Sequence, residues 1–217
     1  MRRLALLACL IALPSLAANA AGPGTPEARA EARELLAYSI GLETSIGKGQ
    51  VQVLAKALAD RFRKAGFADA DIHVVPYKDT ASLVVRYRGN GTGGRPIGFM
   101  AHMDVVAANR SDWKRDPFTL TEENGYFFGR GTLDIKSEVA LISATMLRLK
   151  REGFVPTRDL VVIFSGDEET AQETIEDLAA NHRDLVDVEY ALNGDGGGGI
   201  LDEKTGKPSH YTVQGAE

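Results

Sequence analysis

Four short motifs of histidine and acidic residues follow one another along the chain, and their side chains are of the types that bind metal ions. They are His102-Met103-Asp104, Gly129-Arg130-Gly131-Thr132-Leu133-Asp134, Asp167-Glu168-Glu169 and Asn193-Gly194-Asp195. Three of the four directly follow an apolar run that is typical of a β-strand. In an open parallel α/β sheet the carboxyl ends of the strands share one edge, where ligands bind. One imidazole and several carboxylates at that edge would suit divalent metal ions, so the pattern favours a metal-dependent hydrolase.

The elements that must position these motifs alternate between helices and apolar strands. The residue patterns predict helices over residues 26–38, 50–65, 135–152 and 171–181. They predict strands over residues 71–77, 82–87, 96–101, 126–128, 160–164 and 188–192, and a polar loop over residues 109–125. This alternation indicates the α/β class, with a mostly parallel sheet flanked by helices.

His102 and Asp104 are two residues apart at the end of one predicted strand. Residues i and i+2 of a strand point to the same side. Asp104 could therefore accept the proton of one ring nitrogen of His102 while the other nitrogen binds metal. A surface His-x-Asp pair without metal is the alternative when this motif is considered alone.

The other acidic residues also have ordinary structural alternatives. Asp134 opens a predicted helix, where the helix dipole favours a carboxylate, so it could be a cap, and Lys136 an ion-pair partner. Glu168 and Glu169 point in different directions in a sharp turn, so one could ligate metal while the other holds a water as general base. They could equally begin a solvated helix, and Asp195 beside its glycines could belong to an ordinary turn. The joint occurrence of four such motifs favours the metal interpretation.

With these motifs the chain resembles the dizinc exopeptidase and deacylase family that includes glutamate carboxypeptidase, di- and tripeptidases, aminoacylase and succinyl-diaminopimelate desuccinylase. The matching stretches are residues 99–106, 129–136, 166–169 and 193–196, within a resemblance that covers about residues 50–199. It implies a zinc exopeptidase-like catalytic domain that is incomplete here, with the family's small lid domain absent.

The resemblance also implies the metal ligands and the cofactor. His102 and Asp195 would bind one Zn²⁺, Asp134 would bridge two Zn²⁺ ions, and Glu169 would bind the second. Mixed imidazole and carboxylate ligation also suits Co²⁺ or Mn²⁺.

The same resemblance assigns the remaining site residues. Glu168 would be the general base that takes a proton from the bridging water and passes it to the leaving amine. Asp104 would orient His102. Substrates of the family are small peptides and N-acyl amino acids, cleaved at an amide bond. An aspartate at position 195 is similar to the peptidase members, whereas deacylases more often have glutamate there.

The chain departs from the family pattern at Ala107, where proline is usual, at Ser137, where glycine is usual, and at its end. Family members continue into the lid and then supply a second zinc-binding histidine. We therefore expect residues 22–217 to be the N-terminal portion of a metallopeptidase catalytic domain that is inactive alone. The alternatives are an N-acyl amino acid deacylase of the same family and a truncated, non-catalytic metal-binding protein.

Residues 1–21 are typical of a secretory signal peptide: Arg2 and Arg3, a short apolar run, and the small-x-small site Ala18-Asn19-Ala20. The sequence thus predicts export, to the periplasm or beyond. Without this segment 23 basic residues stand against 30 acidic ones, about seven net negative charges. No basic patch is visible, so nucleic acid is not an expected partner. After the signal no segment is apolar enough to cross a membrane. The sequence does not predict an oligomeric state.

Overall fold

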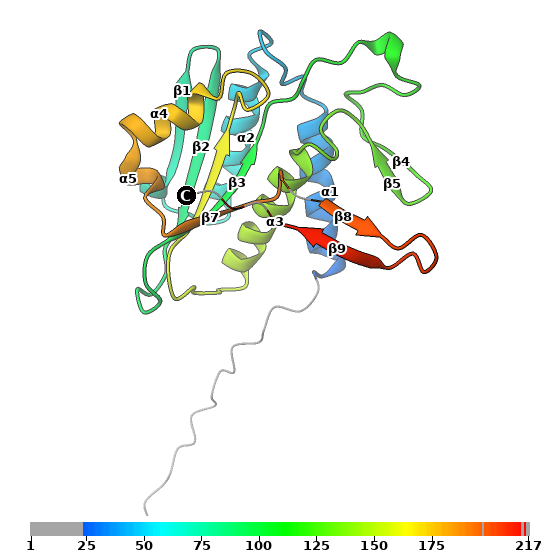
Figure 1. Cartoon of the computed structure of the whole chain (residues 1–217). Coiled ribbons are helices and arrows are strands. Elements are labelled where there is room, and N and C mark those ends of the chain that lie inside the picture. Colours follow the sequence, from blue (N-terminus) through cyan, green and yellow to red (C-terminus); the bar gives the residue numbers. More distant parts are fainter. Residues whose placement is uncertain (1–23, 197, 214, 216–217) are drawn as a thin grey trace, which may run out of the picture.

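The computed structural model describes residues 24–196, 198–213 and 215, and its centre is a five-stranded sheet (Figure 1). The predicted signal peptide, residues 1–21, lies outside the described residues. Across the sheet the strands lie in the order β1-β2-β6-β3-β7. Their bounds are β1 Ile72–Tyr77, β2 Thr80–Tyr87, β3 Ile97–His102, β6 Leu160–Ser165 and β7 Tyr190–Asn193.

The sheet is mixed. Strand β3 pairs in parallel with both β6 and β7, whereas β2 is antiparallel to β1 and to β6. Strands β1 and β2 are joined by the two-residue turn Lys78-Asp79, and so short a connection permits only antiparallel pairing. The α/β class is confirmed, and the parallel part is confined to β3, β6 and β7, which precede three of the four motifs.

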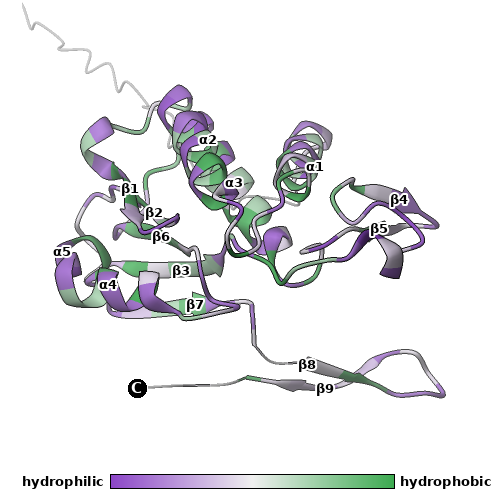
Figure 2. Ribbon diagram, turned by 90° about the horizontal axis from the view of Figure 1, so that it is seen from above, coloured by the Kyte–Doolittle hydropathy of each residue, from purple (hydrophilic) through white to green (hydrophobic). Residues whose placement is uncertain are grey.

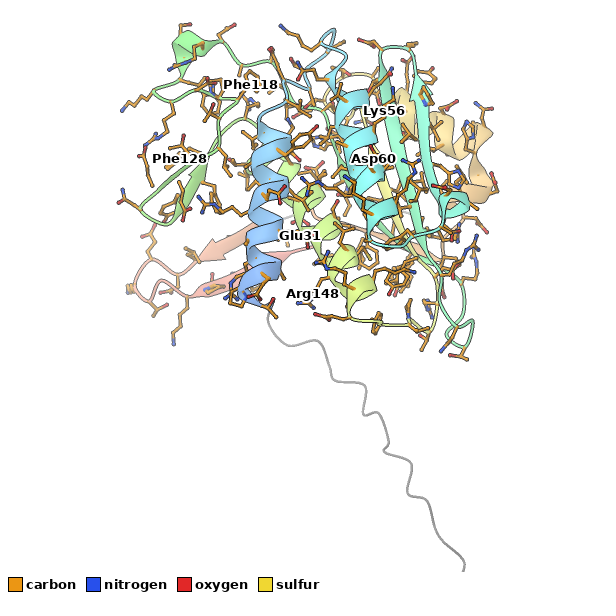
Figure 3. All side chains as sticks on the ribbon, turned by 180° about the vertical axis from the view of Figure 1, so that it is seen from behind. Glu31, Lys56, Asp60, Phe118, Phe128 and Arg148 are labelled. Carbon is orange, nitrogen blue, oxygen red and sulfur yellow. The ribbon has the colours of Figure 1, made fainter. Side chains whose placement is uncertain are left out.

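Helices cover both faces of the sheet (Figure 2). They are α1 Pro26–Ile40, α2 Gln50–Lys64, α3 Lys136–Arg151, α4 Glu173–Asn181 and the short α5 Arg183–Val186. Helices α1, α2 and α3 form one layer, and α4 and α5 lie on the opposite face. Helix α2 packs against the sheet because one of its sides is apolar. Leu54, Leu58 and Phe62 are buried, whereas Lys56 and Asp60 lie on its exposed side (Figure 3).

The core has two parts, one on each face of the sheet. The larger cluster lies between the sheet and helices α1 to α3, and includes Phe62 and Phe164. The smaller one joins Val84, Val161 and Ile163 to Leu178 of α4. The side chains of β3 therefore alternate between two buried environments, and this fixes its register so that His102 ends beside Ser165 of β6.

Several elements differ from the sequence-based expectation. Strand β5, Tyr126–Phe128, is present, but it pairs with a strand β4, Thr121–Glu123, inside the expected loop. Two further strands, β8 Gly198–Leu201 and β9 Pro208–Thr212, form a fully exposed hairpin apart from the main sheet (Figure 2). The short 3₁₀ helices Asp69–Asp71 and Arg110–Asp112 were not predicted either.

All four residues of the edge strand β7 are exposed, including Tyr190 and Leu192. An exposed apolar edge is a surface on which more polypeptide can pair. Within the described part of the chain, no helix has the length and apolar character that a bilayer span would need.

Candidate metal centre

His102 is the last residue of β3, and its imidazole is buried at the carboxyl edge of the sheet. Its Nδ1 atom lies 3.0 Å from the backbone oxygen of Asp104 and 3.5 Å from that residue's carboxylate. Its Nε2 atom faces the opposite way, toward Asp134 and Asp195. When Nδ1 carries the ring proton, the lone pair of Nε2 points into a group of carboxylates.

That group brings together three of the predicted metal ligands. The Nε2 atom lies 3.0 Å from Asp134 and 3.5 Å from Asp195. One ligand atom from each of His102, Asp134 and Asp195 lies within 4.8 Å of the other two. Asp134 comes from the turn before α3 and Asp195 from the segment after β7, so three separate parts of the chain meet at this point.

Asp104 links this group to the glutamate pair. Its buried carboxylate accepts hydrogen bonds from the backbone N–H of Glu168, at 3.1 Å, and of Glu169, at 3.0 Å. The expected bond from the ring of His102 goes chiefly to the backbone oxygen of Asp104 instead. Strand β3 ends at His102, so the rule that i and i+2 side chains share a side no longer applies at Asp104.

Glu168 and Glu169 lie in the turn that follows β6, as predicted, and they do not begin a helix. Helix α4 starts later, and its first amides are satisfied by Asp167, which accepts from Glu173 N and Thr174 N. An Oε2 atom of Glu168 lies 3.9 Å from His102 Nε2. The carboxylate of Glu169 is close enough to Asp134 for the negative charge of Asp134 to add to the effect of burial in raising the pKa of Glu169.

Asp134 does not cap helix α3, because Ile135 occupies the cap position and no side-chain cap hydrogen bond is formed there. The helix-cap interpretation is therefore wrong for this residue. The Asp134 side chain is 58% exposed, so its carboxylate is open to a ligand as well as to His102.

Lys136 behaves differently from the expected ion-pair partner. Among the described residues its Nζ atom has backbone oxygens, and no carboxylate, as hydrogen-bond partners. It is fully buried, and its Nζ donates to the backbone oxygens of Ser39, at 2.7 Å, and Leu42, at 2.8 Å. These carbonyls lie at the end of α1, where a cation is favoured by the helix dipole. Lys136 thus ties α1 to the turn that carries Asp134.

Burial and the charges of the site shift the pKa values of His102 and Glu169. Burial alone would lower the pKa of His102, but the hydrogen bond and charge of Asp104, helped by Asp195, raise it to about 9. Burial also raises the pKa of Glu169, and the negative charge of Asp134 adds to that effect. The raised pKa of His102 reflects the carboxylates that crowd around its ring, whereas the raised pKa of Glu169 comes first from burial.

A divalent cation would relieve this crowding, and the donor set suits one. An imidazole nitrogen with carboxylate oxygens is a common ligand set for Zn²⁺ and for neighbouring first-row metals. The residues present therefore fit the metal that the sequence predicts.

Two residues near the site were not singled out from the sequence. The buried hydroxyl of Thr44 donates to the backbone oxygen of Met103, at 2.8 Å, and so holds the His102–Asp104 segment from the loop after α1. Gln172 contacts the Glu168 carboxylate, at 3.2 Å. Both are polar residues outside any motif, so only the fold brings them to the site.

Comparison with known protein families gives one match over this region. The sequence profile of peptidase family M20/M25/M40 matches residues 98–209, just over half of the chain. The matched region contains every predicted site residue.

Curated proteins and solved structures give related matches. The chain is similar to succinyl-diaminopimelate desuccinylase of Methylocella silvestris, with 36% identity over 52% of this chain and 29% of that protein. A probable succinyl-diaminopimelate desuccinylase of Staphylococcus aureus is 31% identical over 84% of this chain and 42% of that protein. The chain thus spans less than half the length of these relatives.

The fold is similar to that of human carnosine dipeptidase 1, with a TM-score of 0.68 and 20% identity over 78% of this chain and 40% of that chain. An M20 family metallo-carboxypeptidase from Sulfolobus solfataricus gives a TM-score of 0.63 at 20% identity, over 80% of this chain and 38% of that chain.

Proposed function

The chain belongs to peptidase family M20/M25/M40, and from this premise we propose that the protein carrying it hydrolyses an amide bond in small peptides with the help of two Zn²⁺ ions. The observation that carries the proposal is the position of His102 Nε2, which lies 3.0 Å from Asp134 and 3.5 Å from Asp195. Because the chain spans less than half of its curated relatives, the activity is proposed for the whole gene product.

In this proposal His102 and Asp195 would hold one ion, Glu169 would hold the second, and Asp134 would serve both. Zinc in such a site lowers the pKa of a water molecule and polarises the carbonyl of the scissile amide. Co²⁺ or Mn²⁺ could occupy the same ligands.

Glu168 is the proposed general base. It accepts a proton from the attacking water and donates it to the nitrogen of the leaving amine. Its Oε2 atom lies 3.9 Å from His102 Nε2. From the turn after β6 it thus faces the ligand group, which we define as His102, Asp134 and Asp195. Asp104 keeps that turn in place through the amides of Glu168 and Glu169, at 3.1 and 3.0 Å.

A second candidate function is the hydrolysis of N-acyl amino acids. The observation that favours it is the names of the two curated relatives, a succinyl-diaminopimelate desuccinylase and a probable succinyl-diaminopimelate desuccinylase. Both candidates use the same ligands and the same base, and they differ in the group on the acyl side of the amide.

The test combines metal content with turnover in the whole gene product. Its metal content is measured by mass spectrometry, and a panel of dipeptides is compared with N-acetyl and N-succinyl amino acids. About two zinc ions per chain and faster turnover of dipeptides would support the peptidase, and faster turnover of acyl amino acids the deacylase. Bound metal without turnover would support the non-catalytic metal-binding alternative, and a protein with neither metal nor turnover would contradict all three interpretations.

We further propose that the protein is exported. The support is the basic start, apolar run and small-x-small site within residues 1–21. Fractionation followed by mass measurement tests this: a mature chain lacking about 21 residues is expected outside the cytoplasm, and a full-length cytoplasmic chain would contradict it.

A further inference from the structure

Gln172 holds an unusual position beside the proposed base. It precedes α4, and its φ of 57° lies in the left-handed region that residues other than glycine rarely adopt. Three such non-glycine residues occur in the described part of the chain, and the other two, Lys78 and Asn124, lie in hairpin turns. A conformation of this kind persists only where its surroundings enforce it, and such residues gather at functional sites.

The side chain of Gln172 does not serve the helix that it precedes. It makes no capping hydrogen bond to α4, because Asp167 already accepts from Glu173 N at 2.9 Å and from Thr174 N at 3.0 Å. Its amide nitrogen instead donates to Oε1 of Glu168, at 3.2 Å, and approaches the backbone oxygen of the same residue, at 3.4 Å.

The two oxygens of the Glu168 carboxylate face different partners. Oε1 faces Gln172, whereas Oε2 faces the ligand group and lies 3.9 Å from His102 Nε2. The Glu168 side chain is 38% exposed, so packing alone does not hold it in one rotamer. The cavity at this point, of about 180 Å³, is lined by Gln172 together with His102, Glu168 and Asp195.

We propose that Gln172 is a positioning residue, which fixes the rotamer of Glu168 so that Oε2 is directed at the reacting water. The inference rests on the proposed function, because it assumes that Glu168 is the base. It assigns no chemical step to Gln172 itself. A base that is misplaced by a rotamer change loses rate without losing substrate affinity.

Two substitutions separate the side chain from the backbone. Gln172→Gly relieves the left-handed conformation and removes the amide, whereas Gln172→Met keeps the length and the backbone but removes the donor. Asn124→Gly is the matched control, since it relieves the same conformation, φ 53°, in the β4–β5 turn. All are made in the whole gene product, loaded with Zn²⁺.

Both Gln172 variants are expected to lose on the order of tenfold in kcat, with KM and metal content unchanged. Gln172→Gly is expected to melt no lower than the native protein, and Asn124→Gly to keep native kcat. Native kcat in either Gln172 variant would overturn the inference, and so would a loss confined to Gln172→Gly.

A second measurement needs neither metal nor turnover. The β-methylene protons of Glu168, assigned with Glu168→Gln, are followed by NMR in the metal-free protein. One rotamer in the native protein and averaging in both Gln172 variants are expected. Averaging already present in the native protein would overturn the inference. If the native protein turns over no amide substrate, the proposed function fails, and this measurement still decides whether Gln172 restrains Glu168.

Discussion

The Nε2 atom of His102 lies 3.0 Å from a carboxylate oxygen of Asp134, although the two residues are 32 positions apart in the sequence. The strand β3 delivers the first to the sheet edge, and the turn before α3 delivers the second. In a protein without bound metal this contact favours a protonated imidazole. A proton and the proposed metal ion would therefore compete for the same nitrogen.

That competition predicts a pH dependence of metal affinity. In the metal-free protein the pKa of His102 is raised to about 9, because the bond and charge of Asp104 outweigh burial. Binding must then release one proton at any lower pH, so the affinity for Zn²⁺ should rise about tenfold per pH unit between pH 6 and 8. Competition titration with a chromophoric chelator measures this. An affinity that does not vary over that range would contradict the prediction.

Replacement of Asp104 by asparagine should weaken both the fold and the site. One end of the asparagine amide would turn an N–H toward the amide of Glu168 or Glu169, where the carboxylate now accepts two hydrogen bonds. We expect a loss of about 1–3 kcal/mol in the free energy of unfolding and of about 10–100-fold in zinc affinity.

Denaturant titration and metal competition measure the two effects of Asp104→Asn. Asp79→Asn, in the exposed β1–β2 turn, is the matched control and should leave both quantities unchanged. Equal behaviour of the two variants would show that Asp104 does not hold the glutamate turn.

Gly131 should tolerate no side chain. Its φ is +90°, and a Cβ there would lie 3.0 Å from Cδ of Lys136 and 3.0 Å from Cγ1 of Val105. Gly131→Ala should lower the free energy of unfolding by about 2–4 kcal/mol, which combines strain with overpacking. Gly47→Ala is the control for strain alone, because φ is +77° and nothing lies within 4 Å. Chemical denaturation compares the two variants, and equal losses would refute the packing argument.

Because Lys136 is buried, we expect its contribution to the free energy of unfolding to change with pH. Burial lowers its pKa to about 7, against an opposing effect of the Asp104 charge. Between pH 7 and the ordinary lysine value the unfolded chain holds a proton that the folded protein lacks, so this contribution to stability increases as pH rises. Below pH 7 both states are protonated, and the cost of the buried charge is present in full.

Lys136→Met removes that titration while His102, which acts in the opposite direction, is common to both proteins. Urea unfolding at pH 7 and pH 9 should show the native protein gaining on the order of 2 kcal/mol relative to the variant. A difference that does not change with pH would contradict the lowered pKa.

The sequence could predict that His102, Asp134 and Asp195 lie close together, because their motifs have local signatures. His102, Asp134, Glu168 and Asp195 follow apolar runs or glycine turns, and parallel strands place such positions at one edge. The α/β class follows from the same runs. The metal-binding and catalytic roles of these residues stay predictions until metal and turnover are measured.

Other features could not be read from residue type. Lysine is rarely buried, so the position of Lys136 under α1 is a property of the fold and not of its neighbours in sequence. The β8–β9 hairpin was missed because its strands are fully exposed, with Gly198 and Gly199 in one and Pro208 in the other. Without a buried face there is no apolar alternation to detect.

The most direct test of the central claim is Glu168→Ala in the whole gene product, with zinc content and amide hydrolysis measured on the same sample. The account predicts native zinc content, since Glu168 is not a proposed ligand, and a loss of about 10²–10⁴-fold in kcat. Unchanged turnover in this variant would show that Glu168 is not the general base and would contradict the proposed mechanism.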